Sequence, residues 1–234
     1  MRLGIMQPYF MPYLGYFSLI KHTDEFILLD TVQFIYHGWI ERNRILKQTG
    51  GWMYISVPLK KHSRETMIKD ILIDNSQNWK SKILSQIQHY RKAPYFWQIK
   101  SLLEELFSRD YTSITLLDQA ALRLICDYLG IQRGIPVFSE MQCDIGPVNA
   151  PDEWALQICK ALQADEYWNP PGGIDFFDKS KYAAAGIDMH FQEIILQEYP
   201  QKGGVFEPGL SILDAIMFNS PETVNGMLDQ FSLL

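Results

Sequence analysis

The sequence predicts an α/β fold with a parallel sheet at its core. The first observation is an apolar run at residues 3–6, which predicts a buried strand almost at the N-terminus. The second is another apolar run at residues 25–29, which follows a helix expected at residues 13–21. A strand, a helix and a strand in this order form a βαβ unit, which requires parallel strands with helices on the faces of the sheet.

The rest of the chain predicts further strands and a series of helices. Strands are expected at residues 52–59, 70–73 and 166–168, and a polar, basic loop joins the first two. Helices are expected at residues 79–90, 95–107, 113–129, 151–162, 175–185, 210–219 and 221–230. Because no repeat or linker divides the chain, we expect residues 1–234 to form one domain, a Rossmann-like parallel sheet core with helical C-terminal elaboration.

Composition narrows the class of protein. The chain has 234 residues, of which 47% are hydrophobic and 21% charged, as in ordinary globular proteins. Its net charge of −6 argues against nucleic acid as a partner. We find no signal peptide and no apolar run of membrane-spanning length, so we expect a cytoplasmic protein without a membrane partner. The three cysteines are too scattered for a disulfide framework, and the histidines show no metal-ligand spacing.

Residues 7–16 are the densest group of polar and aromatic side chains, and they directly follow the first strand. Open α/β sheets bind ligands at this position, where strands end and helices begin. Tyr13 and Tyr16 occupy the two histidine positions of a degenerate H-x-G-H signature, the motif of nucleotidyl-transferring enzymes. Gly15 leaves room for a ligand or another backbone. Tyrosine is neutral near pH 7, so the positive charge must come from elsewhere. The alternative is that both tyrosines pack the helix against the sheet.

The second dense segment, residues 30–44, begins where the second strand ends. Six Lys and Arg face a single Glu between residues 37 and 64, on a protein of negative net charge. Because guanidinium groups bind phosphate or carboxylate in pairs of hydrogen bonds, the segment predicts a site for a small anionic ligand. An alternative role for Asp30 is to cap the next turn. The candidate catalytic residues are Asp30, Arg42 and Arg44, and the candidate ligand-binding residues are Gln7, Tyr13, Gly15, Tyr16, Gln33, Trp39 and Asn43.

Several sequence runs resemble the WbqC-like protein family along nearly the whole chain. They include MQPYFMPYLGYFSLI at the N-terminus, ILLDTVQF, the W-I-x-R-N-R-I run at residues 39–45, K-A-P-Y-F at 92–96 and FEPGLSILD at 206–214. The resemblance implies a bacterial protein associated with O-antigen and other polysaccharide gene clusters, some of which make sugars bearing amino-acyl groups. It carries over no catalytic residue. The turn at residues 167–173, YWNPPGG, is richer in proline than the family pattern.

Two hypotheses of different class follow. The first is an enzyme that uses ATP or another nucleotide with Mg²⁺, or a nucleotide-sugar. It would catalyse nucleotidyl transfer or the ATP-dependent amino-acylation of an amino sugar, in surface polysaccharide or secondary-metabolite biosynthesis. The second is a non-catalytic binding or assembly protein of a polysaccharide pathway, because the chain has no Walker loop, catalytic triad or metal cluster motif. A homodimer is compatible with either hypothesis.

Overall fold

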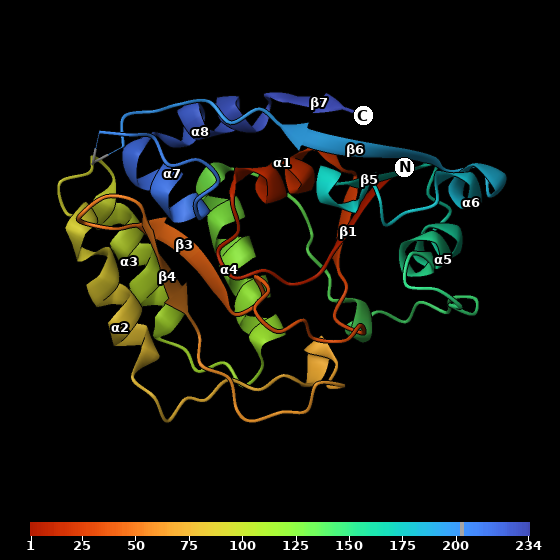
Figure 1. Cartoon of the computed structure of the whole chain (residues 1–234), viewed down its shortest axis with the longest axis horizontal. Coiled ribbons are helices and arrows are strands. Elements are labelled where there is room, and N and C mark those ends of the chain that lie inside the picture. Colours follow the sequence, from red (N-terminus) through yellow and green to blue (C-terminus); the bar gives the residue numbers. More distant parts are fainter. Residues whose placement is uncertain (202–203) are drawn as a thin grey trace.

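The computed structural model describes residues 1–201 and 204–234 and confirms a mixed α/β fold. A five-stranded sheet runs in the order β2-β1-β5-β6-β7 (Figure 1). Its strands are β1 (Arg2–Met6), β2 (Glu25–Leu28), β5 (Glu166–Asn169), β6 (Asp188–Ile194) and β7 (Phe231–Leu233). The first four pair in parallel, and β7 is antiparallel to β6. The sheet is therefore mostly parallel, as the sequence predicts.

The predicted βαβ unit is confirmed. β1 leads into α1 (Leu14–His22) and then into β2, which pairs with β1 in parallel. The chain later returns to the other side of β1 with β5. Neighbouring strands on the two sides of β1 are therefore reached by different connections, so the sheet has a topological switch point between β1 and β5. In open α/β sheets, ligands bind outside the carboxyl ends of the strands at such a point.

Both faces of the sheet are covered. Alternate strand residues point to opposite faces, and the residues of each face belong to a different core. Phe26, Leu28 and Trp168 belong to the core beneath α1 and α8 (Pro221–Leu228). Ile27 and Tyr167 belong to a second core beneath α5 (Glu153–Ala161) and α6 (Lys179–Ala184). Near-continuous apolar strands are typical of a sheet buried on both faces.

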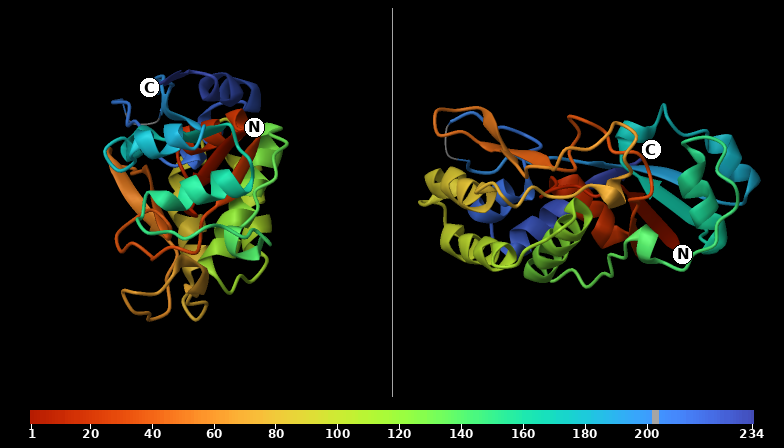
Figure 2. Two further views of the ribbon diagram at one scale, coloured as in Figure 1. Left: turned by 90° about the vertical axis from the view of Figure 1, so that its right-hand side faces the viewer. Right: turned by 90° about the horizontal axis from the view of Figure 1, so that it is seen from below.

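A helical part stands beside the sheet and gives the molecule its long axis (Figures 1 and 2). It contains α2 (Trp79–Gln86), α3 (Phe96–Phe107), α4 (Ile114–Leu129) and α7 (Ile212–Phe218). A separate antiparallel hairpin, β3 (Arg42–Leu46) with β4 (Trp52–Ser56), lies against this part of the molecule. Short 3₁₀ turns cover Ile68–Asp70, Ile87–Tyr90, Phe138–Glu140 and Pro171–Gly173. Among the described residues, no helix is long and apolar enough to cross a membrane.

Some predicted elements are wrong or were missed. The strand expected at residues 70–73 is a 3₁₀ turn followed by isolated bridges, because Ile68 and Ile71 are buried at a spacing that suits a helical turn. The expected helical C-terminal elaboration is incomplete, since the last third also contributes strands β6 and β7 to the sheet. Strand β6 was missed because the buried polar residue Gln192 weakens its alternation of apolar and polar residues. Strand β3 was missed because it begins with the polar run Arg-Asn-Arg.

The predicted boundaries of α4 are confirmed. Ser113 accepts a hydrogen bond from the backbone N–H of Leu116, and Gly130 ends the helix in the left-handed conformation, at φ 72°. Cys126 in α4 and Cys159 in α5 are both buried. Glycine adopts the left-handed conformation at no steric cost, whereas a Cβ there is unfavourable.

We therefore expect Gly130→Ala to lower the free energy of unfolding by about 1 kcal/mol. Gly134→Ala is the matched control, because no described atom lies within 4 Å of a Cβ at that position. It should leave stability unchanged or slightly higher. Urea denaturation of both variants measures the difference, and equal effects would contradict the proposed role of Gly130.

Candidate functional site

The two segments singled out from the sequence meet through one buried side chain, Asn43. Asn43 lies on β3 and is fully buried. Its amide nitrogen donates to the backbone carbonyl of Phe10 at 3.3 Å and also to the carbonyl of Met11. Its carbonyl oxygen accepts from the backbone N–H of Arg44 at 2.7 Å. The turn after β1 and the strand that carries Arg42 and Arg44 are therefore joined by the side chain of Asn43, a residue of the W-I-x-R-N-R-I run.

The turn after β1 has a strained backbone that several contacts hold in place. Met11 adopts a positive φ of 46°, which is uncommon for a residue with a side chain. Its carbonyl also accepts from Ser211 Oγ at 2.8 Å, and the carbonyl of Pro12 accepts from the N–H of Ile212 at 2.7 Å. The start of α7 and β3 thus fix this turn from two sides.

The solvent side of the hairpin carries arginines and aromatic rings in alternation. Because side chains of a strand alternate, Arg42 and Arg44 point outward while Asn43 and Ile45 point inward. We call the outward group, with two residues that stack beside it, the arginine–aromatic platform. It consists of Tyr9, Trp39, Arg42, Arg44, Trp52 and Tyr54.

Stacking holds the platform together. The Tyr9 and Trp39 rings are stacked with centroids 5.9 Å apart. The guanidinium of Arg44 lies 5.5 Å from the Trp39 ring centroid and 5.2 Å from that of Trp52. Arg42 lies 4.5 Å from the Tyr54 ring centroid. Trp39 and Trp52 remain 39% exposed, so the stacked surface faces solvent. Such contacts orient a guanidinium and leave its edge available to an anion.

The structure distinguishes the two arginines, which the sequence treats alike. Two donors of Arg42 are bonded within its own turn. Nε donates to the carbonyl of Gly38 at 3.1 Å, and Nη2 donates to that of His37. Arg44 Nη2 donates to the carbonyl of Gly209 at 3.2 Å, and Arg44 Nε has no hydrogen-bond partner among the described residues. Arg44 is thus the stronger candidate to bind an anion.

The tyrosines and the glycine of the first segment have separate roles. Tyr16 is fully buried in α1 and its hydroxyl donates to the carbonyl of Gln7 at 2.8 Å. Tyr13 is the residue before α1, and its ring occupies the space beside Gly15, where a Cβ would lie 2.5 Å from the Tyr13 hydroxyl. The space that the sequence assigns to a ligand at Gly15 is therefore filled by Tyr13. The packing alternative describes Tyr16.

Asp30 and Gln33 belong to other groups of contacts. The buried Asp30 carboxylate accepts from the N–H of Ser139 at 3.0 Å and from its hydroxyl at 2.6 Å, so it fastens the segment along the outer edge of β2. Gln33 is exposed and donates to the carbonyl of Arg64 at 2.6 Å. Both side chains are hydrogen-bonded within the protein. The carboxylate of Asp30 is bonded to Ser139, 109 residues away in sequence, rather than to the turn that follows Asp30.

The proline-rich turn after β5 forms the other side of the switch point. The Tyr167 hydroxyl donates to Asn169 Oδ1 at 3.0 Å, and Asn169 Nδ2 donates to the carbonyl of Pro170 at 2.9 Å. A Cβ on Gly173 would lie 2.4 Å from Asn169 Nδ2, so the turn requires glycine there. Its prolines limit how far this turn can move.

A buried carboxylate behind the hairpin was missed by sequence reasoning. Asp214 on α7 accepts from the Tyr90 hydroxyl at 2.7 Å, the Tyr199 hydroxyl at 2.6 Å and Gln201 Nε2 at 2.6 Å. Burial nevertheless raises its pKa above the usual aspartate range. The donors lie 13, 15 and 124 residues from Asp214 in sequence, spacings at which no periodic pattern could have revealed this group.

The Asp214 group connects to Arg44 from both sides. The Tyr90 hydroxyl accepts from the N–H of Leu46 on β3 at 2.7 Å. Gln201 exchanges hydrogen bonds with the backbone of Glu207, near the Gly209 carbonyl that Arg44 contacts. Asp214 therefore sets the positions of the strand that carries Arg44 and of the loop that receives its guanidinium.

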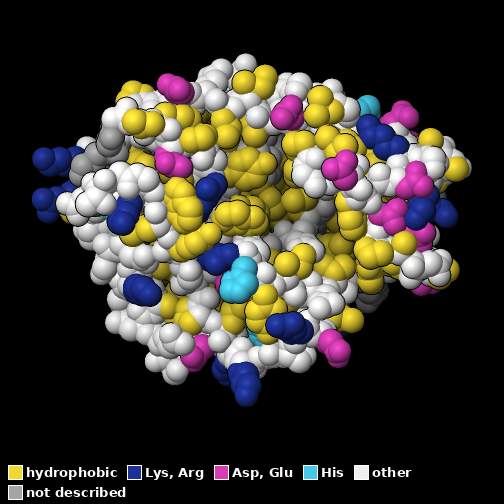
Figure 3. All heavy atoms as spheres, viewed as in Figure 1, with side chains coloured by type: hydrophobic (Ala, Val, Ile, Leu, Met, Phe, Trp, Pro, Cys, Tyr) yellow, Lys and Arg dark blue, Asp and Glu magenta, His cyan; other side chains and the backbone are white. Residues whose placement is uncertain are grey.

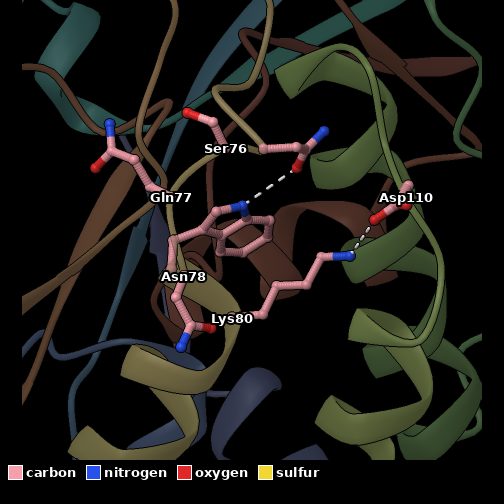
Figure 4. Close-up of a pocket in the computed structure, with 7 residues that line it drawn as sticks. Ser76, Gln77, Asn78, Lys80 and Asp110 are labelled. Atoms are coloured by element: carbon pink, nitrogen blue, oxygen red, sulfur yellow. Dashed lines mark hydrogen bonds and ion pairs between the residues drawn. The ribbon is translucent and has the colours of Figure 1, made fainter.

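The surface beside the platform is hollowed. Figure 3 shows a depression near the middle of the face seen in Figure 1, lined mainly by hydrophobic side chains, with Lys and Arg on the side nearer to the hairpin. Two other depressions lie elsewhere. One of about 390 Å³ runs between α3 and α4. The other, of about 320 Å³, lies at residues 75–80, where Lys80 points to Asp110 and pairs with it (Figure 4). Neither contains a candidate site residue.

Within the described part of the chain, no three His, Cys, Asp or Glu side chains are arranged to hold a metal ion. Burial raises the pKa of the Tyr9 phenol, so it stays protonated at neutral pH and can act as a hydrogen-bond donor. The platform thus offers the Arg44 guanidinium, whose buried Nε has no partner among the described residues, together with stacked rings and a phenol.

Fold and site together define an α/β protein with a cationic, aromatic surface beside the carboxyl edge of its sheet. The chain belongs to the WbqC-like protein family, whose family model matches residues 7–226. It is 30% identical over 221 residues to a protein of Mycobacterium tuberculosis (strain ATCC 25618 / H37Rv) called "Uncharacterized protein Rv1507c", with 93% of each chain covered. No solved structure matches the chain significantly.

Asn43→Ala should lower the free energy of unfolding by about 1–3 kcal/mol, because two buried carbonyl groups lose their donor. The same change should weaken whatever binds Arg44, since the turn carrying Tyr9 is released. Ser56→Ala, an exposed position on the same hairpin, should change stability by less than about 0.5 kcal/mol. Chemical denaturation measures both variants. If Asn43→Ala leaves the free energy of unfolding unchanged, other contacts suffice to hold the turn.

Asp214→Asn should lower the free energy of unfolding by about 1–3 kcal/mol, because an NH₂ group replaces one of the two oxygens that together receive three donors. Asp188→Asn, on the exposed start of β6, is the control and should have little effect. Thermal and urea unfolding compare the two. Equal stability of both variants would contradict the role assigned to Asp214.

Proposed function

We propose that this protein is an enzyme that binds a nucleotide or nucleotide-sugar on the arginine–aromatic platform. The single observation that carries the proposal is the Arg44 guanidinium held between Trp39 and Trp52 with its Nε unused by the described residues. A planar cation meets phosphate through paired hydrogen bonds. Exposed aromatic rings offer stacking surfaces to a base or a sugar ring.

The fold supports this proposal through the place of the platform. Tyr9 lies in the turn after β1, beside the switch point of a mostly parallel sheet. The order β2-β1-β5-β6 is compatible with a Rossmann-like core, and such cores bind nucleotides outside the carboxyl ends of their strands. The N-terminus of α1 begins at the same turn. Its peptide dipole favours negative charge there.

The reaction we propose is nucleotidyl transfer or an ATP-dependent amide ligation. In the ligation, a carboxylate oxygen attacks the α-phosphorus of ATP and pyrophosphate leaves. An amine nitrogen then attacks the acyl carbon, with loss of a proton, and AMP leaves. Arg44 would stabilise the charge on the transferred phosphoryl group, and Tyr9 would donate a hydrogen bond. Since the described residues present no set of three carboxylates, Mg²⁺ would be held largely by the phosphates, as is usual for this ion.

The alternative is a binding or assembly protein without catalysis. The engagement of Asp30 by Ser139 favours it, because this removes the candidate base from the platform. Incubation with ATP, a panel of carboxylic acids and amines, and detection of AMP and amide by mass spectrometry distinguishes the two. If the protein binds nucleotide but turns over none of the acids and amines in the panel, the result favours the non-catalytic binding protein.

Arg44→Ala should weaken binding of ADP or UDP by about tenfold to a hundredfold, the loss expected for a charge-assisted contact. Arg44→Lys should recover only part of it, because lysine keeps the charge but lacks the planar fork. Lys47→Ala removes the same charge from the exposed end of the same hairpin and should have little effect. Isothermal titration calorimetry measures all three variants. Unchanged affinity in Arg44→Ala would remove the platform from nucleotide binding.

A further inference from the structure

The two edges of the five-stranded sheet differ. At one edge, the segment that begins at Pro136 covers β2, because the N–H of Leu28 donates to the carbonyl of Pro136 at 2.9 Å and Leu28 forms a parallel bridge with Val137. At the other edge, no described segment pairs with the outer side of β7, which lies at the margin of the molecule (Figure 1). An open edge strand presents unpaired backbone groups that can bond to another chain.

The register of β7 identifies the backbone groups that point outward. Phe191 of β6 and Leu234 exchange both backbone hydrogen bonds, at 3.1 and 2.9 Å. Bonded and non-bonded pairs alternate along an antiparallel ladder, so Ser232 also bonds to β6, whereas Phe231 and Leu233 do not. The N–H and C=O groups of Phe231 and Leu233 therefore point away from β6, and no described residue bonds to them.

This edge lacks the features that protect most edge strands. Charged side chains, proline and bulges normally prevent pairing between the edges of two sheets. β7 and Leu234 carry no charged residue and no proline, and the register with β6 contains no bulge. Leu233 and Leu234 are also 43% and 50% exposed. Because β7 is only three residues long, we expect the pairing it forms to be weak and reversible.

We propose that β7 pairs with β7 of a second copy of this protein around a two-fold axis. In this antiparallel pair, Ser232 lies opposite the partner's Ser232, and Phe231 of each copy lies opposite Leu233 of the other. Since Phe231 and Leu233 carry the outward-pointing groups, each of the two Phe231–Leu233 pairs exchanges two backbone hydrogen bonds. The pairing joins the two five-stranded sheets into one continuous sheet.

A second copy suits this edge because the edge is complementary to itself. The outward-pointing groups of Phe231 and Leu233 lie symmetrically about Ser232, as a two-fold axis requires. The side chains of Phe231 and Leu233 share one face of the strand, so each apolar side chain meets an apolar side chain across the axis. Asp229, the charged residue nearest to β7 in sequence, is paired with Lys21 at 2.6 Å, which limits repulsion between the copies.

Sedimentation velocity of the wild-type protein at concentrations from about 1 to 500 µM tests the dimer. We expect a monomer–dimer equilibrium with a dissociation constant on the order of 10 µM, because the paired strands are short. A protein that stays monomeric over the whole series would overturn the proposal. Assemblies that grow beyond the dimer would also overturn it, since a two-fold pairing closes after two copies.

Charge substitutions at the exposed Ser232 test the register of the pairing. Ser232→Lys and Ser232→Glu each place two like charges opposite one another across the axis, so each should raise the dissociation constant about threefold to tenfold. An equimolar mixture of the two variants should restore the dimer, because opposite charges then face each other. Ser101→Lys, at an exposed position on α3, is the matched control and should leave the dimer unchanged. Dissociation that mixing does not reverse would overturn the pairing around Ser232.

A proline substitution tests the backbone hydrogen bonds. Leu233→Pro removes an outward N–H but keeps the bonds that Ser232 and Leu234 make to β6. The symmetric dimer then loses two hydrogen bonds, so its dissociation constant should rise about tenfold or more. Leu233→Ala loses the side chain but keeps the N–H, and it should have the smaller effect. Thermal unfolding of both variants checks that the monomer is folded. Equal dissociation constants for the two variants would overturn the proposed strand pairing.

Discussion

The hydrogen bonds of Asn43 are the constraint on which the arrangement of the site depends. The turn after β1 has a strained residue, Met11, whose conformation must be held by its surroundings. Asn43 supplies donors to this turn while its own carbonyl is satisfied by the backbone of β3. One side chain thus couples the end of a sheet strand to a hairpin that is not part of that sheet. Together with the hydrogen bond from the N–H of Phe10 to the carbonyl of Trp39, at 3.1 Å, this coupling fixes Tyr9 relative to Trp39.

The same coupling explains why two similar arginines differ. Arg42 and Arg44 flank Asn43, and both are partly exposed on the outer face of the hairpin. Arg42 closes the turn that precedes it, so two of its five N–H donors, including the one on Nε, are already used. Arg44 is positioned from behind by the group around Asp214 and from the sides by two tryptophan rings. Preorganised cations of this kind bind anions with little loss of side-chain entropy, because the rotamer is already restricted.

Much of the fold and part of the site could be predicted from local patterns. Apolar runs and cap residues revealed β1, β2 and α4, and both dense segments at strand ends contain residues that Asn43 joins. Strand β3 was missed because outward arginines mask its alternation. The role of Asp30 was not accessible, since its partner Ser139 lies more than a hundred residues away in sequence. Contacts of this kind depend on tertiary structure and leave no periodic signal.

The buried carboxyl groups of Asp214 and Asp118 differ in a way that the surface of the protein does not reveal. A protein tolerates an unpaired buried charge only at a cost in stability, and such costs are retained where function requires them. Asp214 and Asp118 are chemically identical and equally buried, but only the first receives donors from the described chain. Asp214 receives its donors from the segments that position β3 and the loop at Gly209, so its burial orders the surroundings of Arg44. A preorganised guanidinium loses little side-chain entropy when it binds an anion. The buried carboxylate therefore contributes to the candidate site without touching a ligand.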